Sequence, residues 1–336
     1  MIAPGPANRL SDVPGIQVGN AEDHIVRSGV TVVLPARPAV AAVDVRGGGP
    51  GTRETDVLAP GNLLETVDAV VLSGGSAFGL EAASGVMAAL VEDGRGFPVA
   101  QFRIPIVPGA ILFDLLNGGD KHWGDTPPYR QLGYRAARAA MADFALGNAG
   151  AGLGAVAGGW KGGLGSASLE VAGDPGYRMA ALAAVNAMGS PVMPGSQRLW
   201  AWPWERGSEF GGQQRLPAPA AMEDLDYAFS LEPGQHTTLC VVATDLPLTR
   251  TQAQRLAVMA HDGLARALRP VHTPFDGDVV FVLATGEGPA PDAEAVAQAG
   301  MLAADCVTRA VARGVVEAET LGAFPGYRAT VSGNHP

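Results

Sequence analysis

Apolar residues in this chain fall into two kinds of run. Short, almost uninterrupted runs bounded by proline or glycine cover residues 29–35, 39–48 and 69–75, and two more cover residues 237–245 and 278–286. Runs of this length, rich in valine and closed by turn residues, are typical of buried β-strands. We therefore predict five buried strands at these positions.

Longer stretches show helical spacing and predict four helices. The first lies within residues 76–94, the second covers 134–144, the third begins at Thr249 and the last covers about 291–313. Thr249 and Gln252 form a T-x-x-Q capping box, which is a signature of a helix start. The apolar positions behind the first and third helices are Leu80, Ala83, Met87, Leu90 and Val91, then Leu256, Met259, Ala260, Gly263, Leu264 and Ala267. The end of the chain thus reads strand, helix, strand, helix.

Two middle segments have a different character. Residues 147–171 are almost all glycine and alanine, which predicts closely packed glycine loops. Residues 197–236 carry Trp200, Trp202, Trp204 and several prolines without any sustained period. We expect that second segment to lie on the surface and to be partly ordered by its aromatic side chains.

Composition narrows the class of protein. A chain of 336 residues can bury a sizeable core as one large domain, and its net charge of -10 argues against binding a nucleic-acid backbone. Cys240 and Cys306 sit in apolar runs and read as small buried hydrophobes. No secretory signal and no membrane-spanning run is visible, so we expect a soluble cytoplasmic protein.

Common catalytic motifs fit poorly. The glycines at 150, 152 and 154 give G-x-G-x-G, which is not the spacing of a dinucleotide-binding loop, and the six histidines show no zinc-binding spacing. GGSAFG at 74–79 has Phe78 where a serine hydrolase needs a second glycine, so Ser76 reads as a helix cap.

Thr237 is the remaining candidate nucleophile. It opens the strand of residues 237–245 directly after a Pro-Gly-Gln-His turn. A threonine becomes a useful nucleophile when its own free α-amine acts as the base, because the pKa of that amine is about 8. The peptide bond after His236 would have to be cut first. An ordinary strand with a β-branched first residue fits the same pattern.

Motifs along nearly the whole chain resemble the P1 peptidase family. That family contains β-aminopeptidases, L-aminopeptidase/D-esterase enzymes and nylon-oligomer hydrolases. The similar stretches, in the family's order, are SDVPGIQVGNAE (11–22), SGVTVVLP (28–35), DVRGGGPGTRETD (44–56), LSGGSAFGLEAASGV (72–86), GNAGAGLGA (147–155), AVNAMGSPV (184–192), TTLCVVATD (237–245) and HTPFDGDVVF (272–281).

The resemblance implies a self-cleaving hydrolase. It implies a four-layer αββα sandwich like that of N-terminal-nucleophile hydrolases, with its own strand connectivity. Cleavage between His236 and Thr237 would turn one domain of residues 1–336 into an α fragment, 1–236, and a β fragment, 237–336. Thr237 would then be the N-terminal nucleophile. The family further implies no metal or organic cofactor and a homotetramer of αβ heterodimers.

Four other residues match functional positions of the family. Asn186 matches an asparagine that donates to the oxyanion, a role that is most effective in a buried site. Lys161 matches a lysine near the nucleophile in the nylon-oligomer branch. Asp276 and Asp278 match a D-x-D pair of that branch, where carboxylates orient the nucleophile or favour a charged amine. For Lys161 an exposed loop, and for Asp276 a simple D-G turn, are the plainer interpretations.

Two positions depart from the family. His236 precedes the cut where Asn or Gly is expected, and Phe113 stands where some members carry a tyrosine. Thr237, Lys161 and the D-x-D pair resemble the nylon-oligomer branch, whereas the stretches 13–20 and 47–56 are similar to the aminopeptidases.

We therefore predict an amidohydrolase of the aminopeptidase type, acting through an acyl-enzyme on short peptides, amino-acid amides or related small amides. The alternatives are a 6-aminohexanoate-oligomer hydrolase, an acyltransferase of the ornithine-acetyltransferase type, and an uncut binding protein in which His236 blocks processing. The expected partner is a small-molecule substrate, without nucleic acid or membrane.

Overall fold

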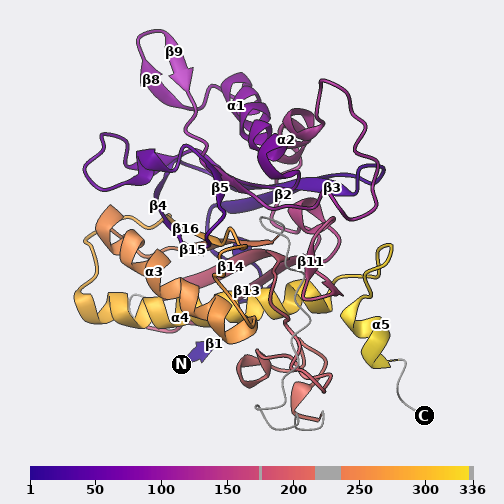
Figure 1. Cartoon of the computed structure of the whole chain (residues 1–336). Coiled ribbons are helices and arrows are strands. Elements are labelled where there is room, and N and C mark those ends of the chain that lie inside the picture. Colours follow the sequence, from indigo (N-terminus) through magenta and orange to yellow (C-terminus); the bar gives the residue numbers. More distant parts are fainter. Residues whose placement is uncertain (174–175, 216–235, 333–336) are drawn as a thin grey trace.

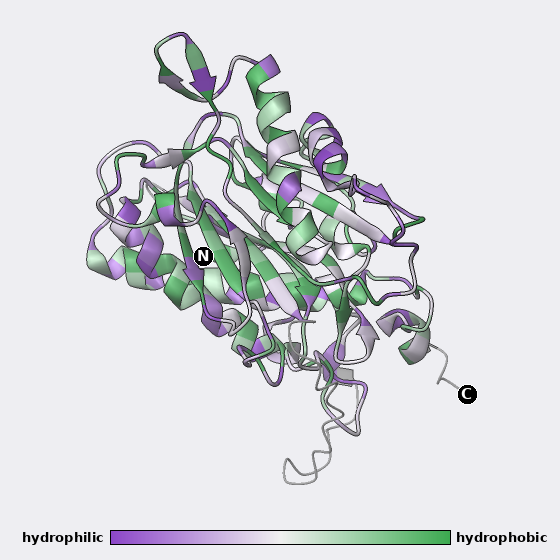
Figure 2. Ribbon diagram, turned by 45° about the horizontal axis from the view of Figure 1, so that its top comes forward, coloured by the Kyte–Doolittle hydropathy of each residue, from purple (hydrophilic) through white to green (hydrophobic). Residues whose placement is uncertain are grey.

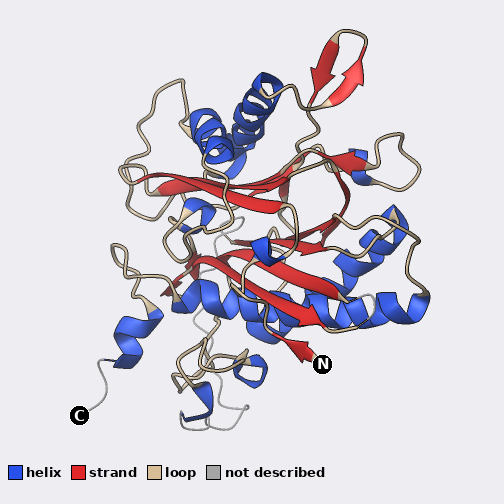
Figure 3. Cartoon of the chain, turned by 180° about the vertical axis from the view of Figure 1, so that it is seen from behind, coloured by secondary structure: helices blue, strands red, loops and turns tan. Residues whose placement is uncertain are grey.

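Four layers build the molecule: two helices, a five-stranded sheet, a seven-stranded sheet and two more helices (Figures 1 and 3). The computed structural model describes residues 1–173, 176–215 and 236–332. The predicted αββα sandwich is confirmed.

The seven-stranded sheet holds the predicted strand at Thr237 near its centre. Its order is β1-β13-β14-β15-β16-β4-β6. The strands are β1 (Ile2–Ala3), β13 (Gly163–Val171), β14 (Tyr177–Asn186), β15 (Thr237–Thr244), β16 (Val279–Ala284), β4 (Ala39–Val45) and β6 (Thr66–Val67). β15 is parallel to β16 and antiparallel to β14. The two strands that follow residue 236 are therefore inserted between strands that precede it.

The second sheet lies over the first and has the order β2-β3-β7-β10-β5. Its strands are β2 (Ile16–Asp23), β3 (Ser28–Pro35), β7 (Val70–Ser73), β10 (Gly109–Ile111) and β5 (Gly51–Arg53). Two small hairpins stand apart from it: β8 (Phe97–Val99) with β9 (Phe102–Ile104), which projects at the top of Figure 1, and β11 (Val156–Ala157) with β12 (Trp160–Lys161).

Helices cover the outer face of each sheet. α1 (Ala82–Glu92) and α2 (Tyr129–Arg138) lie on the five-stranded sheet, and α3 (Arg250–Ala267) and α4 (Ala293–Val316) lie on the seven-stranded one (Figure 1). A short α5 (Tyr327–Ser332) ends the described chain. No helix among the residues that the structure describes is both long enough and apolar enough to cross a bilayer.

Three hydrophobic cores lie between these four layers, and they explain the uninterrupted apolar runs. In β15, Leu239 and Val241 face the core between the two sheets, while Cys240 and Val242 face the core against α3 and α4. Because alternate side chains of a strand point to opposite faces, a strand buried on both sides must be apolar throughout. Figure 2 shows the apolar residues concentrated in these inner strands.

The structure corrects some of the sequence predictions. The second helix runs from 129 to 138 rather than from 134 to 144, because Pro128 starts it and Met141 pairs with Val18 in a β-bridge. The first helix begins as a 3-10 turn, Ser76–Glu81, before α1. Strands β2 and β14 were not predicted, and the glycine-rich segment ends in the nine-residue strand β13.

The tryptophan-rich segment is more buried than expected in its first part. Leu199, Ala201 and Phe210 belong to the core against α3 and α4, while Arg198 and Trp202 stack in a cation–π contact. Residues 216–235 of the predicted surface segment lie outside the described residues. The early part of this segment thus packs into the hydrophobic core instead of lying on the surface.

A buried ion pair joins this segment to the C-terminal half. The guanidinium of Arg309, on α4 and 1% exposed, donates to both carboxylate oxygens of Glu209 at 2.7 and 2.9 Å. It also donates to the Asn8 side chain and to the Ser168 carbonyl. Burial opposes the ionisation of Glu209, but the hydrogen bonds and positive charge of Arg309, together with hydrogen bonds from Asn8 and the Arg206 N–H, outweigh it and lower the pKa of this carboxyl. The pair ties residues on both sides of position 236 together.

Replacing Arg309 with methionine is expected to lower the free energy of unfolding by about 3 kcal/mol or more, because the Glu209 carboxylate stays buried without its partner. Urea unfolding followed by circular dichroism measures the loss. The double variant Arg309→Met/Glu209→Gln leaves no buried charge and should recover a large part of it. Equal stability of the single and double variants would contradict this explanation.

Candidate active site

The ends of three neighbouring strands place the predicted site residues together. Asn186 is the last residue of β14 and pairs directly with Thr237, the first residue of β15. β16 runs parallel to β15, and Asp278 precedes its first residue. These three strand ends lie side by side at the same end of the seven-stranded sheet. Residues far apart in sequence therefore come together there.

Thr237 lies against the peptide bond that it would attack. Its side chain is only 3% exposed, and its hydroxyl donates to the His236 carbonyl oxygen at 2.5 Å. The Gly277 N–H donates to the same oxygen at 2.9 Å. A backbone donor on this oxygen polarises the carbonyl and stabilises negative charge on it when a nucleophile adds.

Gly277 is a residue that the sequence analysis missed. A Cβ atom added to it would lie 2.6 Å from the Thr237 hydroxyl oxygen, so only glycine lets the backbone come this close. The signal was present as the glycine inside the D-G-D motif, where the sequence suggested only a turn before a strand.

Asp278 supports the strand that carries the nucleophile. It is 1% exposed, and one carboxylate oxygen accepts from the Thr238 N–H at 2.7 Å. The other oxygen accepts from the backbone N–H of His272 at 3.1 Å and bonds its ring Nδ1 at 2.8 Å. Asp278 thus fixes the start of β15 without a direct bond to the Thr237 hydroxyl.

Asp276 has a different role from its neighbour. Its carboxylate accepts from the backbone and hydroxyl of Thr273 at 2.9 and 2.6 Å and from the Met188 N–H at 3.2 Å. Burial, reinforced by the charge of Asp278, raises the pKa of this carboxyl. Its side-chain bonds hold the turn before β16, which agrees with the plainer interpretation of this residue.

Two histidines lie behind Asp278, and neither was predicted. The rings of His272 and His261 meet edge to face with centroids 4.8 Å apart. His261 Nε2 lies 3.0 Å from the Asp44 carbonyl oxygen, and burial lowers the pKa of His261 to about 4. His272 thus bonds Asp278 directly, and His261 packs against the His272 ring.

The side-chain amide of Asn186 has a fixed orientation. Its Oδ1 accepts from the Val156 N–H at 2.9 Å, and its Nδ2 donates to the Phe113 carbonyl at 3.0 Å. The amide nitrogen therefore faces the loop after β10, next to the first residue of β15. Phe113 contributes a backbone carbonyl here and an apolar ring, but no hydroxyl.

Lys161 is buried rather than in an exposed loop. It is 1% exposed, and its Nζ donates to the Gly152 and Gly162 carbonyls at 2.9 and 2.7 Å. Burial lowers the pKa of this amine to about 7, although the charge of Asp114 acts in the opposite direction. Lys161 pairs with Val156, the residue that bonds Asn186, so it lies one strand pair from the candidate oxyanion donor.

A cavity of about 200 Å³ opens beside His236. Its walls combine Asn186 and His236 with apolar side chains from three loops. The residues that line the cavity are Phe113, Asp114, Leu116, Asn117, Gly154, Val156, Gly159, Asn186, His236 and Phe324. The lining thus combines the candidate catalytic residue Asn186 with apolar side chains and a few polar ones, as small-molecule sites often do.

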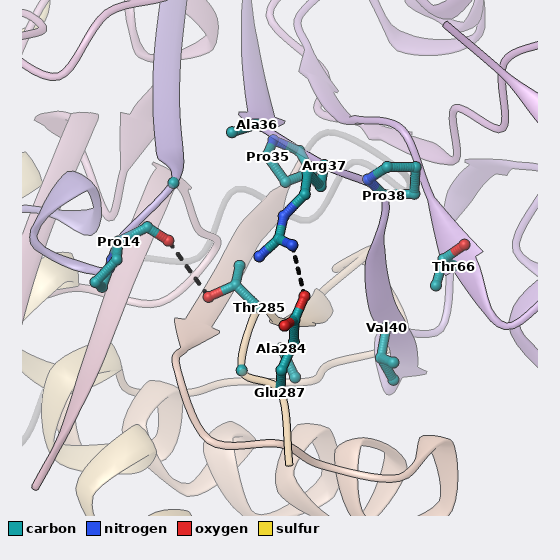
Figure 4. A pocket seen from close by; sticks show the side chains of 12 residues that line it. Pro14, Pro35, Ala36, Arg37, Pro38, Val40, Thr66, Ala284, Thr285 and Glu287 are labelled. Carbon is teal, nitrogen blue, oxygen red and sulfur yellow. Dashed lines mark hydrogen bonds and ion pairs between the residues drawn. The ribbon is translucent and has the colours of Figure 1, made fainter.

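A second hollow lies at the opposite end of β16 (Figure 4). Figure 4 shows an exposed ion pair across it, in which Arg37 donates to Glu287 at 2.5 Å, while the Thr285 hydroxyl donates to the Pro14 carbonyl at 3.4 Å. A strand rises about 3.3 Å per residue, which places this hollow roughly 20 Å from Asp278. It is separate from the site.

Ser76 does not cap its helix. Its φ is +51°, and the residue before the 3-10 turn is Gly75, whose N–H donates to Asp114 at 2.8 Å. The backbone at the start of this helix is therefore hydrogen-bonded by the loop after β10 and not by the Ser76 side chain. Within the described residues no histidine contacts Ser76, which leaves Thr237 as the candidate nucleophile.

Comparison with known proteins gives matches along nearly the whole chain. Peptidase family S58 matches residues 8–329. An uncharacterized aminopeptidase of Mycobacterium tuberculosis is 42% identical over 96% of this chain and 97% of its own. A 6-aminohexanoate-oligomer endohydrolase of Kocuria sp. is 30% identical over 82% of this chain and 74% of its own.

Solved structures share the fold. A β-aminopeptidase of Burkholderia sp. superimposes with a TM-score of 0.71 at 23% identity, over 100% of this chain and 97% of that one. The L-aminopeptidase D-Ala-esterase/amidase of Ochrobactrum anthropi, described as a variant of the N-terminal-nucleophile hydrolase fold, has a TM-score of 0.71 at 23% identity over 96% and 90%.

Proposed function

The chain belongs to peptidase family S58 and hydrolyses amide or peptide bonds, and from this premise we propose that it first cuts itself between His236 and Thr237 and then uses Thr237 as an N-terminal nucleophile. The observation that carries the proposal is the convergence of the Thr237 hydroxyl and the Gly277 N–H on the His236 carbonyl. Residues 1–236 and 237–336 would be the two fragments.

Self-cleavage needs only groups that already surround the bond. Thr237 Oγ1 adds to the His236 carbonyl carbon, and the Gly277 N–H stabilises the oxyanion. The C–N bond then breaks, and its nitrogen takes up the proton that the threonine hydroxyl has lost, which leaves an ester between His236 and the Thr237 side-chain oxygen. Water opens this ester to a His236 carboxylate and a free Thr237 amine.

Turnover repeats the same chemistry with an external amide. The freed Thr237 amine takes the hydroxyl proton and returns it to the leaving amine, because its pKa suits both directions near neutral pH. Asn186 and the Gly277 N–H stabilise the oxyanion. Asp278, bonded to the Thr238 N–H, keeps the strand in place, and water releases the acyl group.

Lys161 would tune this site through its lowered pKa. In the unfolded chain its pKa is near 10.5, and in the folded chain it is about 7. Between these values the unfolded state binds more protons, so stability rises with pH from about 7 towards 10.5. Below about pH 7 Lys161 is positively charged and would disfavour the charged form of the Thr237 amine, whereas above it the lysine is neutral and would not.

In an uncut Thr237→Ala background, Lys161→Met is expected to abolish this pH-dependent gain, which is on the order of 2 kcal/mol between pH 6.5 and pH 9. Urea unfolding of both chains at the two pH values measures it. An identical pH dependence in the two proteins would show that Lys161 keeps its ordinary pKa.

Small amides with a free amine are the proposed substrates, as in the relatives named aminopeptidases. The relatives at 42% identity carry that name, whereas those named 6-aminohexanoate-oligomer hydrolases reach 30%, so we favour the aminopeptidase type. Hydrolysis of L-aminoacyl p-nitroanilides, but not of their N-acetyl forms, tests this choice. Cleavage of 6-aminohexanoate oligomers alone would favour the second type, and acyl transfer to added amines with little hydrolysis would favour an acyltransferase.

Self-association belongs to the same proposal. Phe97, Val99, Phe102 and Ile104 lie on one face of the β8–β9 hairpin, and each is more than 40% exposed. A two-stranded hairpin gains stability when its apolar face is covered, and a second subunit would cover it. The tetramer and the cytoplasmic location stay predictions, for which analytical ultracentrifugation and cell fractionation are the tests.

A further inference from the structure

His236 supplies the acyl group in the first reaction of this protein. In self-cleavage Thr237 Oγ1 forms an ester with the His236 carbonyl carbon, and in turnover it forms the same ester with the acyl carbon of a substrate. The His236 oxygen already accepts from Gly277 in the arrangement that an oxyanion would need. The residue that bears the acyl carbon of a substrate should therefore lie where His236 lies now.

The His236 ring lies among described residues that offer its nitrogens no hydrogen bonds. Both ring nitrogens are buried and make no hydrogen bond to any described residue. Burial lowers the pKa of the imidazole, although the charges of Asp276 and Asp278 partly oppose this, so the ring is neutral near pH 7. A buried polar atom without a partner costs free energy, so an apolar ring of similar size should fit this place better than imidazole.

The cavity beside the ring extends this apolar environment. Phe113, Leu116, Val156 and Phe324 surround about 200 Å³ of space, which is room for a larger side chain once His236 has left. Among the described residues that line the cavity, Asp114 is the one ionisable side chain besides His236, and it is buried. None of these described lining residues is a lysine or arginine that could pair with an acidic substrate.

From this we infer, on the basis of the proposed function, that the cavity next to His236 is the acyl subsite and that it selects substrates whose first residue bears a neutral aromatic or branched aliphatic side chain. His236 fills the subsite in the uncut chain, and it vacates the subsite after cleavage. Phe113 contributes a wall of this subsite, which gives the departure from tyrosine a role in specificity.

One series of experiments compares substrates. Initial rates of the processed enzyme are measured on the L-p-nitroanilides of Phe, Leu, His, Gly and Glu. Phe and Leu are expected to exceed Gly in kcat/KM by roughly tenfold or more, and Glu to be the poorest, since one apolar group in a pocket changes rates by 10- to 200-fold. Equal values, or a preference for Gly or Glu, would overturn the inference.

A second series uses the chain as its own substrate. Self-cleavage half-times are measured for His236→Phe, His236→Gly and His236→Glu after refolding. His236→Phe should cleave at least as fast as the natural chain, and His236→Glu roughly tenfold more slowly or worse. A faster His236→Glu would overturn the inference. A cut enzyme that hydrolyses none of the anilides would contradict the proposed turnover, while this series would still decide on the subsite.

Leu116 offers a matched pair of variants at the mouth of the cavity. It is 68% exposed, so its replacement does not disturb the core. Leu116→Glu should raise the ratio of kcat/KM for the cationic Lys-anilide to kcat/KM for the neutral Phe-anilide several-fold. The uncharged Leu116→Gln should leave this ratio as it is in the wild type. No difference between the two variants would show that substrates do not pass this residue.

Discussion

Replacing Thr237 with alanine is expected to leave the protein as one chain of 34.3 kDa and to abolish amide hydrolysis. The wild-type chain should instead give pieces of about 24 and 10 kDa, in proportion to their 236 and 100 residues, and the smaller piece should begin with TTLCVV. The loss follows because alanine has no oxygen to form the ester. Intact mass and N-terminal sequencing measure cleavage, and an anilide assay measures turnover.

Two controls separate this chemistry from a folding defect. Thr237→Ser keeps a hydroxyl and should still cleave. Thr238→Val alters the next threonine, whose buried hydroxyl has no hydrogen-bond partner among the described residues, and should cleave like the wild type. Cleavage in the Thr237→Ala chain, or a small fragment that begins at another residue, would show that the nucleophile lies elsewhere.

Gly277→Ala is expected to slow self-cleavage and turnover by 100-fold or more. The added Cβ would lie 2.6 Å from the Thr237 hydroxyl oxygen, so the hydroxyl or the Gly277 N–H must move. Losing one well-placed oxyanion donor costs about 100- to 1,000-fold in rate. Time courses of cleavage after refolding, followed by gel electrophoresis, measure the first reaction.

Gly49→Ala is the matched control for Gly277→Ala. Gly49 lies next to the same loop and donates its N–H to the Asp276 carbonyl at 2.8 Å, but a Cβ added there would have its nearest neighbours at 3.8 Å. It should cleave at the wild-type rate. If the two variants cleave equally fast, the close approach of Gly277 to Thr237 has no part in catalysis.

Strands that are buried on both faces were the elements best predicted from the local sequence. The runs at 237–245 and 278–286 became β15 and β16, and the Thr249–Gln252 box caps α3 with both of its hydrogen bonds formed. β14 was not predicted, because its alanine-rich sequence has little β-propensity. It forms a strand because it pairs with β13 on one side and β15 on the other.

The site was predictable only in part for a related reason. Resemblance placed Thr237, Asn186, Lys161 and the aspartates in one neighbourhood, and the strand ends bring most of them together. Gly277 and His272 act through backbone approach and ring stacking, which depend on how loops fold over the sheet. No local pattern in the sequence encodes such contacts. The burial of Lys161 likewise depends on how the glycine-rich loop folds back, since its Nζ donates to the carbonyls of Gly152 and of the adjacent Gly162.

His236 acquires a clear meaning in this structure. A residue of moderate size occupies the place of the acyl group, whereas asparagine or glycine would fill less of the cavity. The departure from the family at this position therefore does not block the His236–Thr237 peptide bond, whose carbonyl already accepts a hydrogen bond from Gly277.

The insertion of β15 and β16 between β14 and β4 changes the order of the folding reaction once the chain is cut. The intact precursor can form its seven-stranded sheet in a unimolecular reaction. The mature protein would have to bring two separate chains together, because the smaller one supplies only the inner strands β15 and β16 of the seven-stranded sheet. Refolding of mature enzyme should therefore slow with dilution while that of the Thr237→Ala chain does not. Cleavage would thus replace a fold that one chain can regain by itself with one that persists chiefly because it is slow to come apart.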